Sequence, residues 1–340
     1  MLELFPSPTA GAFGRRLKRE RGARVPVTVV TGFLGAGKTT LLRHFLRLPD
    51  GAGTAVVVNE FGEAGIDDVL LRSSSDNIAL LGNGCLCCNV RSDLQVTLHR
   101  LIADRERGVV SHFARIVIET SGLADPSPIL ATFATDRALG GEFYVEAVIA
   151  VVAAQNGTRT IESFAEARRQ VILADRIVIS KTDIADGDAP AILRRTLRKL
   201  NPRARIVEAV AGRVDPQWIL AEPIEERATG FMAGSGAHTD NIASFTLIEE
   251  EPIGWDIFAR TMATLIALRG PDLLRVKGFL NVAGCVGPVV VQFVQHLAHP
   301  PVELDHWPDD DHRSRVVFIA RNLNEQQVKG LLAAVRAVSE

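Results

Sequence analysis

The sequence predicts an α/β protein in which a domain with a mostly parallel sheet is followed by a smaller α+β domain. Three observations lead to this fold class. Short β-branched runs alternate with amphipathic helical stretches over residues 25–210, Gly and Ser become frequent over residues 222–241, and further strand runs with two helices follow. Such alternation implies βαβ crossovers, which produce a parallel sheet covered by helices on both faces.

The elements of the first domain follow from two hydrophobic periods. A strand buried on both faces is a continuous apolar run, whereas a helix that covers the sheet has apolar residues three and four positions apart. The predicted strands cover residues 25–30, 55–58, 115–119, 148–152, 176–179 and 206–207. The predicted helices cover residues 39–48, 92–105, 163–173 and 190–200.

The second domain is expected after a linker without periodic apolar positions. Its predicted strands cover residues 244–248, 274–280, 289–295 and 315–319, and its predicted helices cover residues 255–268 and 325–338. We therefore expect four regions along the chain. They are a flexible basic extension at 1–24, the first domain at 25–221, the linker at 222–241 and the second domain at 242–340.

The composition argues against several classes of protein. The 340 residues carry 38 Lys and Arg against 40 Asp and Glu, so no overall basic field exists to hold nucleic acid or an anionic membrane. No apolar run approaches the ~18 residues that a membrane span requires. The four cysteines are too few for a disulfide scaffold. We expect a cytoplasmic protein whose partners include neither nucleic acid nor a membrane.

A glycine-rich motif follows the first predicted strand. Residues 32–39, GFLGAGKT, match G-x-x-x-x-G-K-[ST] at every fixed position and lead into a helix. In this pattern backbone N–H groups turn inward around phosphate oxygens, and the helix N-terminus adds its positive dipole end. Because motif and context agree, a P-loop NTPase is predicted rather than a chance glycine turn. The expected nucleotide-binding residues are Gly35, Ala36, Gly37, Lys38, Thr39 and Thr40.

Individual roles follow from phosphoryl-transfer chemistry. Lys38 is expected to reach the β and γ phosphates, Thr39 to join a Mg²⁺ shell, and Thr40 to be available for the α phosphate. Glu119 ends a buried strand at the sheet edge where ligands bind, which predicts a second Mg²⁺ ligand and a catalytic role. Gly122 follows closely and would let a backbone N–H approach the γ-phosphate.

A second loop bears on the choice of base. Residues 180–183, SKTD, resemble the [NT]KxD signature by which P-loop GTPases recognise guanine. The carboxylate of Asp183 would accept from the N1–H and N2–H₂ groups of guanine, which adenine cannot offer, while the stem of Lys181 packs along the base. Ser180 stands where Asn is usual, so we expect the loss of an amide that braces this loop. A capped turn before the next helix is the alternative interpretation.

Three of the four cysteines, Cys85, Cys87 and Cys88, lie within four positions. Soft thiolates this close can chelate a borderline or soft ion such as Zn²⁺, whereas Mg²⁺ prefers oxygen. In an extended chain Cys85 and Cys87 point the same way, so two thiolates could share one ion while a further ligand comes from elsewhere. Inert buried cysteines and a vicinal disulfide are the alternatives. Cys285 stands alone and is predicted to be a small core or turn residue.

The order of the motifs TGFLGAGKTTLL, NEFGEAGID, GCLCC, IETSGLADP and SKTD resembles the CobW family of P-loop GTPases, relatives of the nickel-inserting GTPases that serve urease and hydrogenase. The likeness continues in LLRVKGFL, VVVQFVQ and RSRVVFIARNL, so it covers the chain from residue 25 to the end. It implies a GTP- and Mg²⁺-dependent metallochaperone that delivers Zn²⁺ or Co²⁺ to a client metalloprotein. It also implies that Cys85, Cys87 and Cys88 carry this metal.

The sequence departs from the family pattern at three places. The linker contains only His238 where many members have a histidine-rich run, and the strand ending near residue 152 is followed by Ala153 and Ala154 where an Asp-Ala pair is usual. Val58 precedes NEFG where some relatives have an acid that contributes to a metal site. Glu63 is then the nearest acid that could complete the thiolate set.

These observations suggest a GTPase switch in which the segment with the metal-binding cysteines is directly connected to the nucleotide site. Bound GTP would order residues 59–88 and assemble the thiolates, and hydrolysis would release the ion. Turnover is expected to be slow because no Gln takes a water-positioning place, which leaves Glu63 or Asp67 to orient water. The rivals are a non-catalytic scaffold whose cysteines sense redox state or metal, and an ATPase or kinase. A homodimer is compatible with the sequence.

Overall fold

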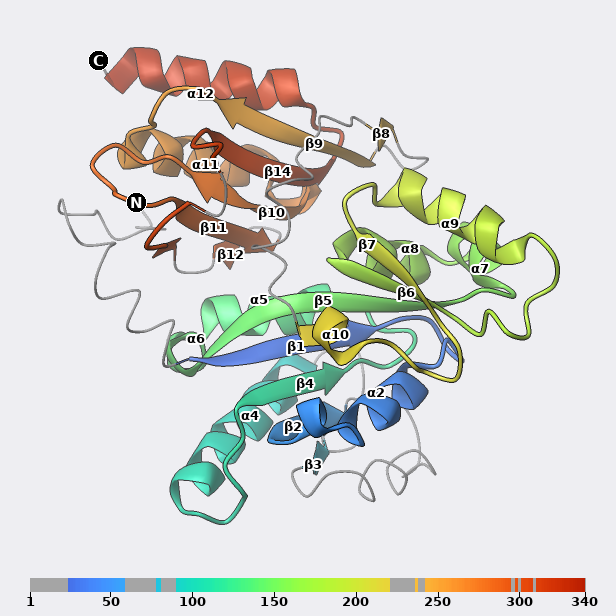
Figure 1. The fold of residues 1–340 in the computed structure, drawn as a ribbon. Coiled ribbons are helices and arrows are strands. Elements are labelled where there is room, and N and C mark those ends of the chain that lie inside the picture. Colours follow the sequence, from blue (N-terminus) through green and yellow to red (C-terminus); the bar gives the residue numbers. More distant parts are fainter. Residues whose placement is uncertain are drawn as a thin grey trace. The chain divides into compact units, whose positions relative to one another are not determined.

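The computed structural model describes residues 24–58, 78–80, 90–220, 236–237, 242–294, 297–298, 301–307 and 310–339 (Figure 1). The chain divides into two compact units, one spanning Val25–Pro223 and the other containing Ile224–Glu340. The first carries the phosphate-loop motif, and the second carries the predicted α+β domain.

The first unit is built on a seven-stranded sheet in the order β3-β2-β4-β1-β5-β6-β7. Every neighbouring pair is parallel, which confirms the predicted sheet. All carboxyl ends therefore lie at one edge, where open α/β sheets bind ligands. The strands are β1 (Val25–Thr31), β2 (Thr54–Val58), β3 (Ile78–Leu80), β4 (Arg115–Glu119), β5 (Phe143–Ala153), β6 (Arg176–Ser180) and β7 (Arg205–Ala209).

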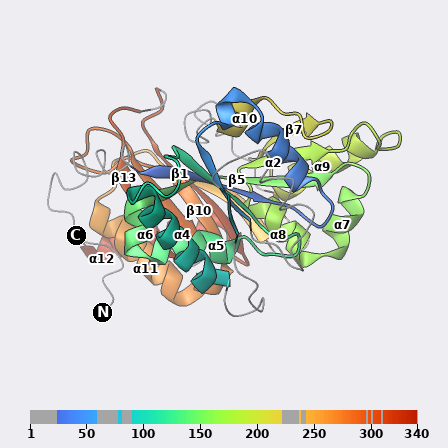
Figure 2. The same cartoon turned by 90° about the horizontal axis from the view of Figure 1, so that it is seen from below.

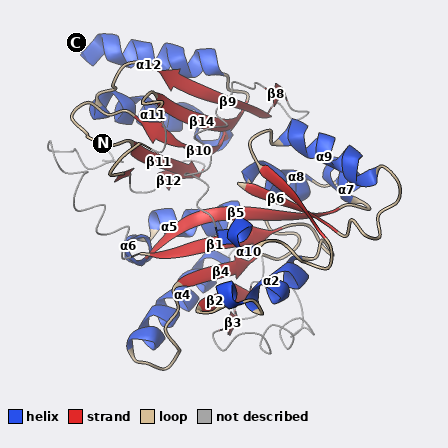
Figure 3. Cartoon of the chain, in the orientation of Figure 1, coloured by secondary structure: helices blue, strands red, loops and turns tan. Residues whose placement is uncertain are grey.

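Helices cover both faces of this sheet (Figure 3). Val151 of β5 packs in a core cluster with α2 and α10, whereas its neighbours Ala150 and Val152 pack in another with α7, α8 and α9. Alternation along a strand sends successive side chains to opposite faces, so one apolar run serves two cores. The helices are α2 (Lys38–Leu46), α4 (Val90–Glu106), α5 (Ser127–Thr135), α6 (Arg137–Glu142), α7 (Gly157–Ser163), α8 (Ala165–Leu173), α9 (Ala189–Leu200) and α10 (Pro216–Leu220), with a 3-10 turn at Pro49–Gly51.

The helix expected over residues 163–173 is confirmed as α8, but it begins two residues later, because Phe164 is extended (φ −123°, ψ 122°) and Ser163 belongs to α7. Helices α7 and α10 were not predicted. Helices α5 and α6, which lie beside α4 (Figure 2), were missed. Prolines at the start of α5 and two glycines inside α6 resemble turn signals. Tertiary packing and the Asp136 cap, which accepts from the N–H groups of Ala138 and Leu139, override them.

The second unit confirms the α+β prediction. Its antiparallel sheet has the order β12-β11-β10-β14-β9-β8, with β13 also paired to β11. One face carries a core built around Trp255, Phe258 and Leu332 of the two helices and Phe318 of the sheet. The elements are β8 (Gly236–Ala237), β9 (Ile242–Glu249), α11 (Trp255–Arg269), a 3-10 turn at Gly270–Asp272, β10 (Leu273–Leu280), β11 (Val289–Val294), β12 (Leu297–Ala298), β13 (Val302–Glu303), β14 (Ser314–Arg321) and α12 (Glu325–Ser339).

One segment of the predicted linker is ordered backbone. Gly236 pairs with Ser244 and Ala237 with Ala243, so β8 extends the sheet next to β9. Cys285 lies in a turn in which its N–H donates to Val282, and its side chain packs against the core, as the sequence predicted. No helix in the described parts of the chain combines the length and apolar character needed to cross a bilayer.

The acidic loop before β14 is held by arginines. Asp311 accepts from the Arg313 guanidinium at 2.8 and 3.0 Å, and Arg315 lies 3.5 Å away. The Arg313 hydrogen bond lowers the pKa of Asp311 to about 2, with further lowering by the Arg315 charge. The ring of Trp307 stacks on His312 with centroids 5.0 Å apart. Within the described residues this loop brings no three His, Cys, Asp or Glu side chains together as metal ligands.

Candidate nucleotide site

The phosphate loop connects β1 to α2 at the carboxyl edge of the sheet. Gly32 adopts φ +145°, and a Cβ there would lie 2.2 Å from the Val151 carbonyl oxygen, so only glycine lets the loop approach β5 this closely. Leu41, Leu42 and Phe45 anchor α2 and are each at most 2% exposed. Burial of each stabilises the fold by about 1.5–3 kcal/mol, so the helix that ends the loop is firmly held.

Lys38 and Thr39 open α2 and face the ends of neighbouring segments. The ammonium of Lys38 donates to the Gly32 carbonyl at 2.9 Å and to the Phe33 carbonyl at 3.4 Å. The Thr39 hydroxyl donates to Oε1 of Glu119 at 2.7 Å, and Glu119 is only 5% exposed. A hydroxyl and a carboxylate in direct contact form an oxygen donor set of the kind that Mg²⁺ prefers. The two predicted Mg²⁺ ligands are thus neighbours.

Gly122 lies in a turn directly after β4. The N–H of Ala124 donates to the Ser121 carbonyl at 3.0 Å and closes this turn. A Cβ on Gly122 would lie 2.7 Å from the backbone nitrogen of Leu34, so the turn and the phosphate loop touch backbone to backbone. A side chain here would force the two loops apart. The structure therefore brings Gly122 against the phosphate loop, as its predicted role requires.

The carboxyl end of β6 contacts the phosphate loop through Ser180, its last residue. Its buried hydroxyl donates to the Ala36 carbonyl at 2.5 Å. The amide of the usual Asn is absent here, as expected, and the Ser180 hydroxyl supplies one link between β6 and the phosphate loop. Lys181 adopts the left-handed conformation with φ +58°, which is uncommon for a residue with a Cβ. Asp183 follows with an exposed side chain.

Sequence reasoning missed a further loop at the same edge. The chain turns after β7, where the N–H of Arg213 donates to the Val210 carbonyl at 3.0 Å. Gly212 has φ +75°, and a Cβ there would lie 2.7 Å from the Thr40 carbonyl oxygen, so this loop packs on the first turn of α2. Thr40 itself is exposed. The pair Ala211-Gly212, which follows a β-branched run, is the sequence signal that could have predicted this turn.

The segment with the predicted metal ligands begins at this edge. Cys85, Cys87, Cys88 and Glu63 lie outside the described residues. The strands that flank them are described, and Leu80 of β3 pairs with Val58 of β2, which pairs with Glu119 of β4. Two strand spacings amount to about 10 Å between the backbones at Leu80 and Glu119. The carboxyl ends of β2 and β3, at Val58 and Leu80, therefore lie close to the Thr39 and Glu119 pair.

The Ser180 contact gives a testable expectation. Replacing Ser180 with alanine removes the hydroxyl and leaves the buried Ala36 carbonyl without this donor. Affinity for nucleotide should fall by about 5- to 10-fold, the equivalent of one net hydrogen bond. Titration calorimetry measures it. Thr196→Ala is a matched control, because the Thr196 hydroxyl also donates to a main-chain carbonyl, Ile192 at 3.2 Å, on a helix away from the loop. Equal affinities in both variants would contradict the role of Ser180.

Comparison with known proteins extends this picture to the whole chain. Residues 26–208 match the family described as CobW/HypB/UreG, nucleotide-binding domain, and residues 242–336 match the cobalamin synthesis protein cobW C-terminal domain. The protein named zinc chaperone YjiA of Escherichia coli (strain K12) is 34% identical over 319 residues, which cover 92% of this chain and 99% of the relative. The protein named zinc chaperone CobW of Pseudomonas aeruginosa is 31% identical over 354 residues, 93% of this chain and 92% of the relative.

Solved structures give the same relationship. The Zn(II)-bound YjiA GTPase from E. coli aligns with a TM-score of 0.66 and 30% identity, over 92% of this chain and 99% of that chain. A Zn(II)-bound triple mutant of YjiA GTPase, in which alanine replaces one glutamate and two cysteines, aligns equally well. The matches cover both units of the fold and include the phosphate loop. The chain therefore belongs to the CobW family, with a CobW/HypB/UreG nucleotide-binding domain followed by a CobW C-terminal domain.

Proposed function

We propose that this chain is a GTP-hydrolysing metallochaperone that carries Zn²⁺, or Co²⁺, and delivers it to a client metalloprotein. The observation that carries the proposal is the contact between Thr39 and Glu119 beside Lys38, within a domain of the CobW family. Relatives with the same two domains are named zinc chaperones, and one is named a GTPase.

Each phosphate-binding residue would have a separate role in hydrolysis. Water attacks the γ-phosphorus, the bond to the bridging oxygen breaks, and GDP and phosphate leave. Lys38 would neutralise charge on the β and γ phosphates, and the backbone N–H groups of Gly35, Ala36 and Gly37 would hold phosphate oxygens. Thr39 and Glu119 would hold Mg²⁺, which supplies further charge neutralisation. Glu63 is proposed to orient the water, and turnover without a client is expected to be slow.

Guanine selection is assigned to the loop after β6. Asp183 would accept from the two guanine donors, and Lys181 would pack its stem along the base. Ser180 supports this arrangement because it ties the base loop to the phosphate loop at Ala36. The missed loop at residues 210–213 lies on α2 next to Thr40, where it would form a second wall of the base pocket.

The metal site is assigned to Cys85, Cys87 and Cys88, with Glu63 as the nearest oxygen ligand. The strand register supports coupling to the nucleotide, because Leu80 lies about 10 Å from Glu119 across two strand spacings. Cys85 follows Leu80 by five residues, a tether of at most about 17 Å when fully extended. A change at the γ-phosphate can therefore reach the thiolates through a short stretch of chain. Hydrolysis would loosen the thiolate set and release the ion to the client.

The test is a Zn²⁺ competition against a chromophoric chelator. Wild-type protein is titrated with Mg²⁺ and a non-hydrolysable GTP analogue, with Mg²⁺ and GDP, and without nucleotide. Affinity should be highest with the GTP analogue and at least about 10-fold lower with GDP, a coupling of typical allosteric size. Equal affinities in the three states would refute nucleotide-gated release.

Two further measurements, phosphate release and competition by ATP, distinguish the rival functions. GTP binding without release of phosphate, with Zn²⁺, Co²⁺ and reductant varied, would favour a regulatory scaffold. Displacement of GTP by an equal concentration of ATP would favour an ATPase or kinase. If guanine is selected through Asp183, ATP should compete poorly with the wild type and noticeably better with Asp183→Ala.

A further inference from the structure

Gln170 on α8 is a buried amide that reaches the turn after β4. It is 1% exposed, and its Nε2 donates to the Gly122 carbonyl at 3.1 Å and to the Ala124 carbonyl at 3.0 Å. The neighbouring Arg169 adds an ion pair to Asp125 at 3.1 Å, but its side chain is 45% exposed and such pairs contribute little. Gln170 is therefore the stronger link between α8 and this turn.

Hydrogen bonds in this turn set the direction of two backbone N–H groups, one of them through Gln170. A trans peptide points its N–H opposite its carbonyl. The Ser121 carbonyl accepts from the N–H of Ala124, which sets the direction of the Gly122 N–H. The Gly122 carbonyl accepts from Gln170, which sets the direction of the following N–H on Leu123. Because Gly122 also touches the Leu34 backbone, the turn is held from α8 on one side and limited by the phosphate loop on another.

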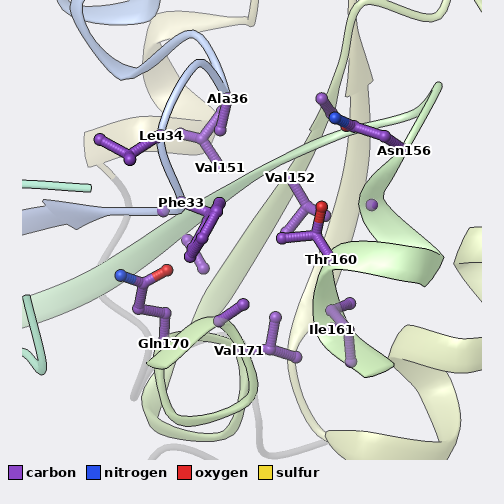
Figure 4. Close-up of a pocket in the computed structure, with 15 residues that line it drawn as sticks. Phe33, Leu34, Ala36, Val151, Val152, Asn156, Thr160, Ile161, Gln170 and Val171 are labelled. Carbon is purple, nitrogen blue, oxygen red and sulfur yellow. The ribbon is translucent and has the colours of Figure 1, made fainter. Parts of the chain in front are cut away.

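The surroundings of Gln170 argue against a ligand-binding role. Figure 4 shows the side chain extending from α8 toward the strand that carries Val151 and the loop that carries Phe33. The cavity beside it has a volume of about 20 Å³, room for about one water molecule. An organic molecule does not fit there. What Gln170 offers is its pair of hydrogen bonds to the turn.

We propose that Gln170 is a positioning residue that orients the Gly122 turn toward the γ-phosphate and so sets the preference for GTP over GDP. The proposal rests on the proposed function, since it requires nucleotide on the phosphate loop. GDP lacks the γ-phosphate and has nothing for this turn to contact, so the contribution of Gln170 appears only with the triphosphate. A purely structural amide would stabilise both nucleotide states alike.

The chain supplies a matched control, Asn201, which binds the carboxyl end of α8. Asn201 is 3% exposed, and its Nδ2 donates to the carbonyls of Val171 at 2.9 Å and Ala174 at 2.8 Å. It performs the same chemistry, a buried amide that satisfies main-chain carbonyls, without contact to the Gly122 turn. Loss of Asn201 reports what losing a structural amide does to this domain.

The experiment compares wild type, Gln170→Leu and Asn201→Leu with full-length protein and Mg²⁺. Dissociation constants for a fluorescent non-hydrolysable GTP analogue and for the matching GDP are measured in each. Gln170→Leu should lower the affinity for the GTP analogue by about 10-fold, which is within the contribution of one hydrogen bond to a charged group. Its affinity for GDP should change by less than about 2-fold. Single-turnover hydrolysis should slow by a similar factor. Asn201→Leu should leave the ratio of the two constants at the wild-type value.

The outcomes separate this proposal from the proposed function. Absence of GTP binding to the wild type would defeat both. The role of Gln170 alone would be overturned if the wild type binds GTP normally but Gln170→Leu keeps the wild-type ratio of the two dissociation constants. An equal loss of affinity for both nucleotides is one form of that result. Thermal unfolding checks that each variant is folded. If Gln170→Leu fails this check, Gln170→Met, which keeps an unbranched chain of similar length, is measured by the same criteria.

Discussion

Replacing Lys38 with alanine should lower the rate of GTP hydrolysis by about 10²- to 10³-fold, the cost of removing one preorganised group from a developing charge. Lys38 is 9% exposed, and its ammonium contacts the carbonyls of Gly32 and Phe33 within the phosphate loop. A cation placed there can reach phosphate oxygens without first shedding a large hydration shell. Phosphate release from excess GTP and Mg²⁺ measures the rate.

The control for this experiment is Lys199→Ala. Lys199 lies exposed in the last turn of α9, so its removal changes the net charge by the same amount without touching the loop. Its hydrolysis rate should equal that of the wild type. A Lys38→Ala protein that retains more than a tenth of the wild-type rate would contradict the assignment of Lys38 and favour a scaffold or another nucleotide.

Replacing Cys85, Cys87 and Cys88 together with serine should lower the affinity for Zn²⁺ by at least about 10³-fold, because thiolates supply most of the 10–16 kcal/mol that structural zinc sites provide. Serine hydroxyls are neutral at physiological pH and are poor ligands for zinc. The dependence of Zn²⁺ affinity on the GTP analogue should disappear in the same variant. Chelator competition measures both effects.

Cys285→Ser is the matched control for thiol loss. Burial, with a contribution from the nearby Glu303 charge, raises the pKa of the Cys285 thiol to about 11, so this thiol stays protonated at neutral pH. Its replacement should leave Zn²⁺ affinity unchanged. If the triple serine variant binds Zn²⁺ as tightly as the wild type, the cysteines are not the metal ligands.

Much of the first unit was predictable from the sequence because its strands are continuous apolar runs. Each of the six strands predicted there lies within an observed strand, and the match at 115–119 is complete. The short β3 and the helices α5, α6, α7 and α10 were not predicted. Their sequences are short or carry Pro and Gly, so their local preferences are weak and packing against neighbouring elements decides their conformation.

The sequence by itself determined the phosphate loop and the six strands predicted in the first unit, because both depend on residues that are close in the chain. The tertiary structure decided which distant groups meet. Thr39 and Glu119 are 80 positions apart, Gln170 and Gly122 are 48 apart, and Ser180 and Ala36 are 144 apart. The sheet order places β4 and β5 on either side of β1 and adds β6 beside β5. That arrangement brings the carboxyl ends of β4 and β6 to the phosphate loop, and no local pattern encodes it.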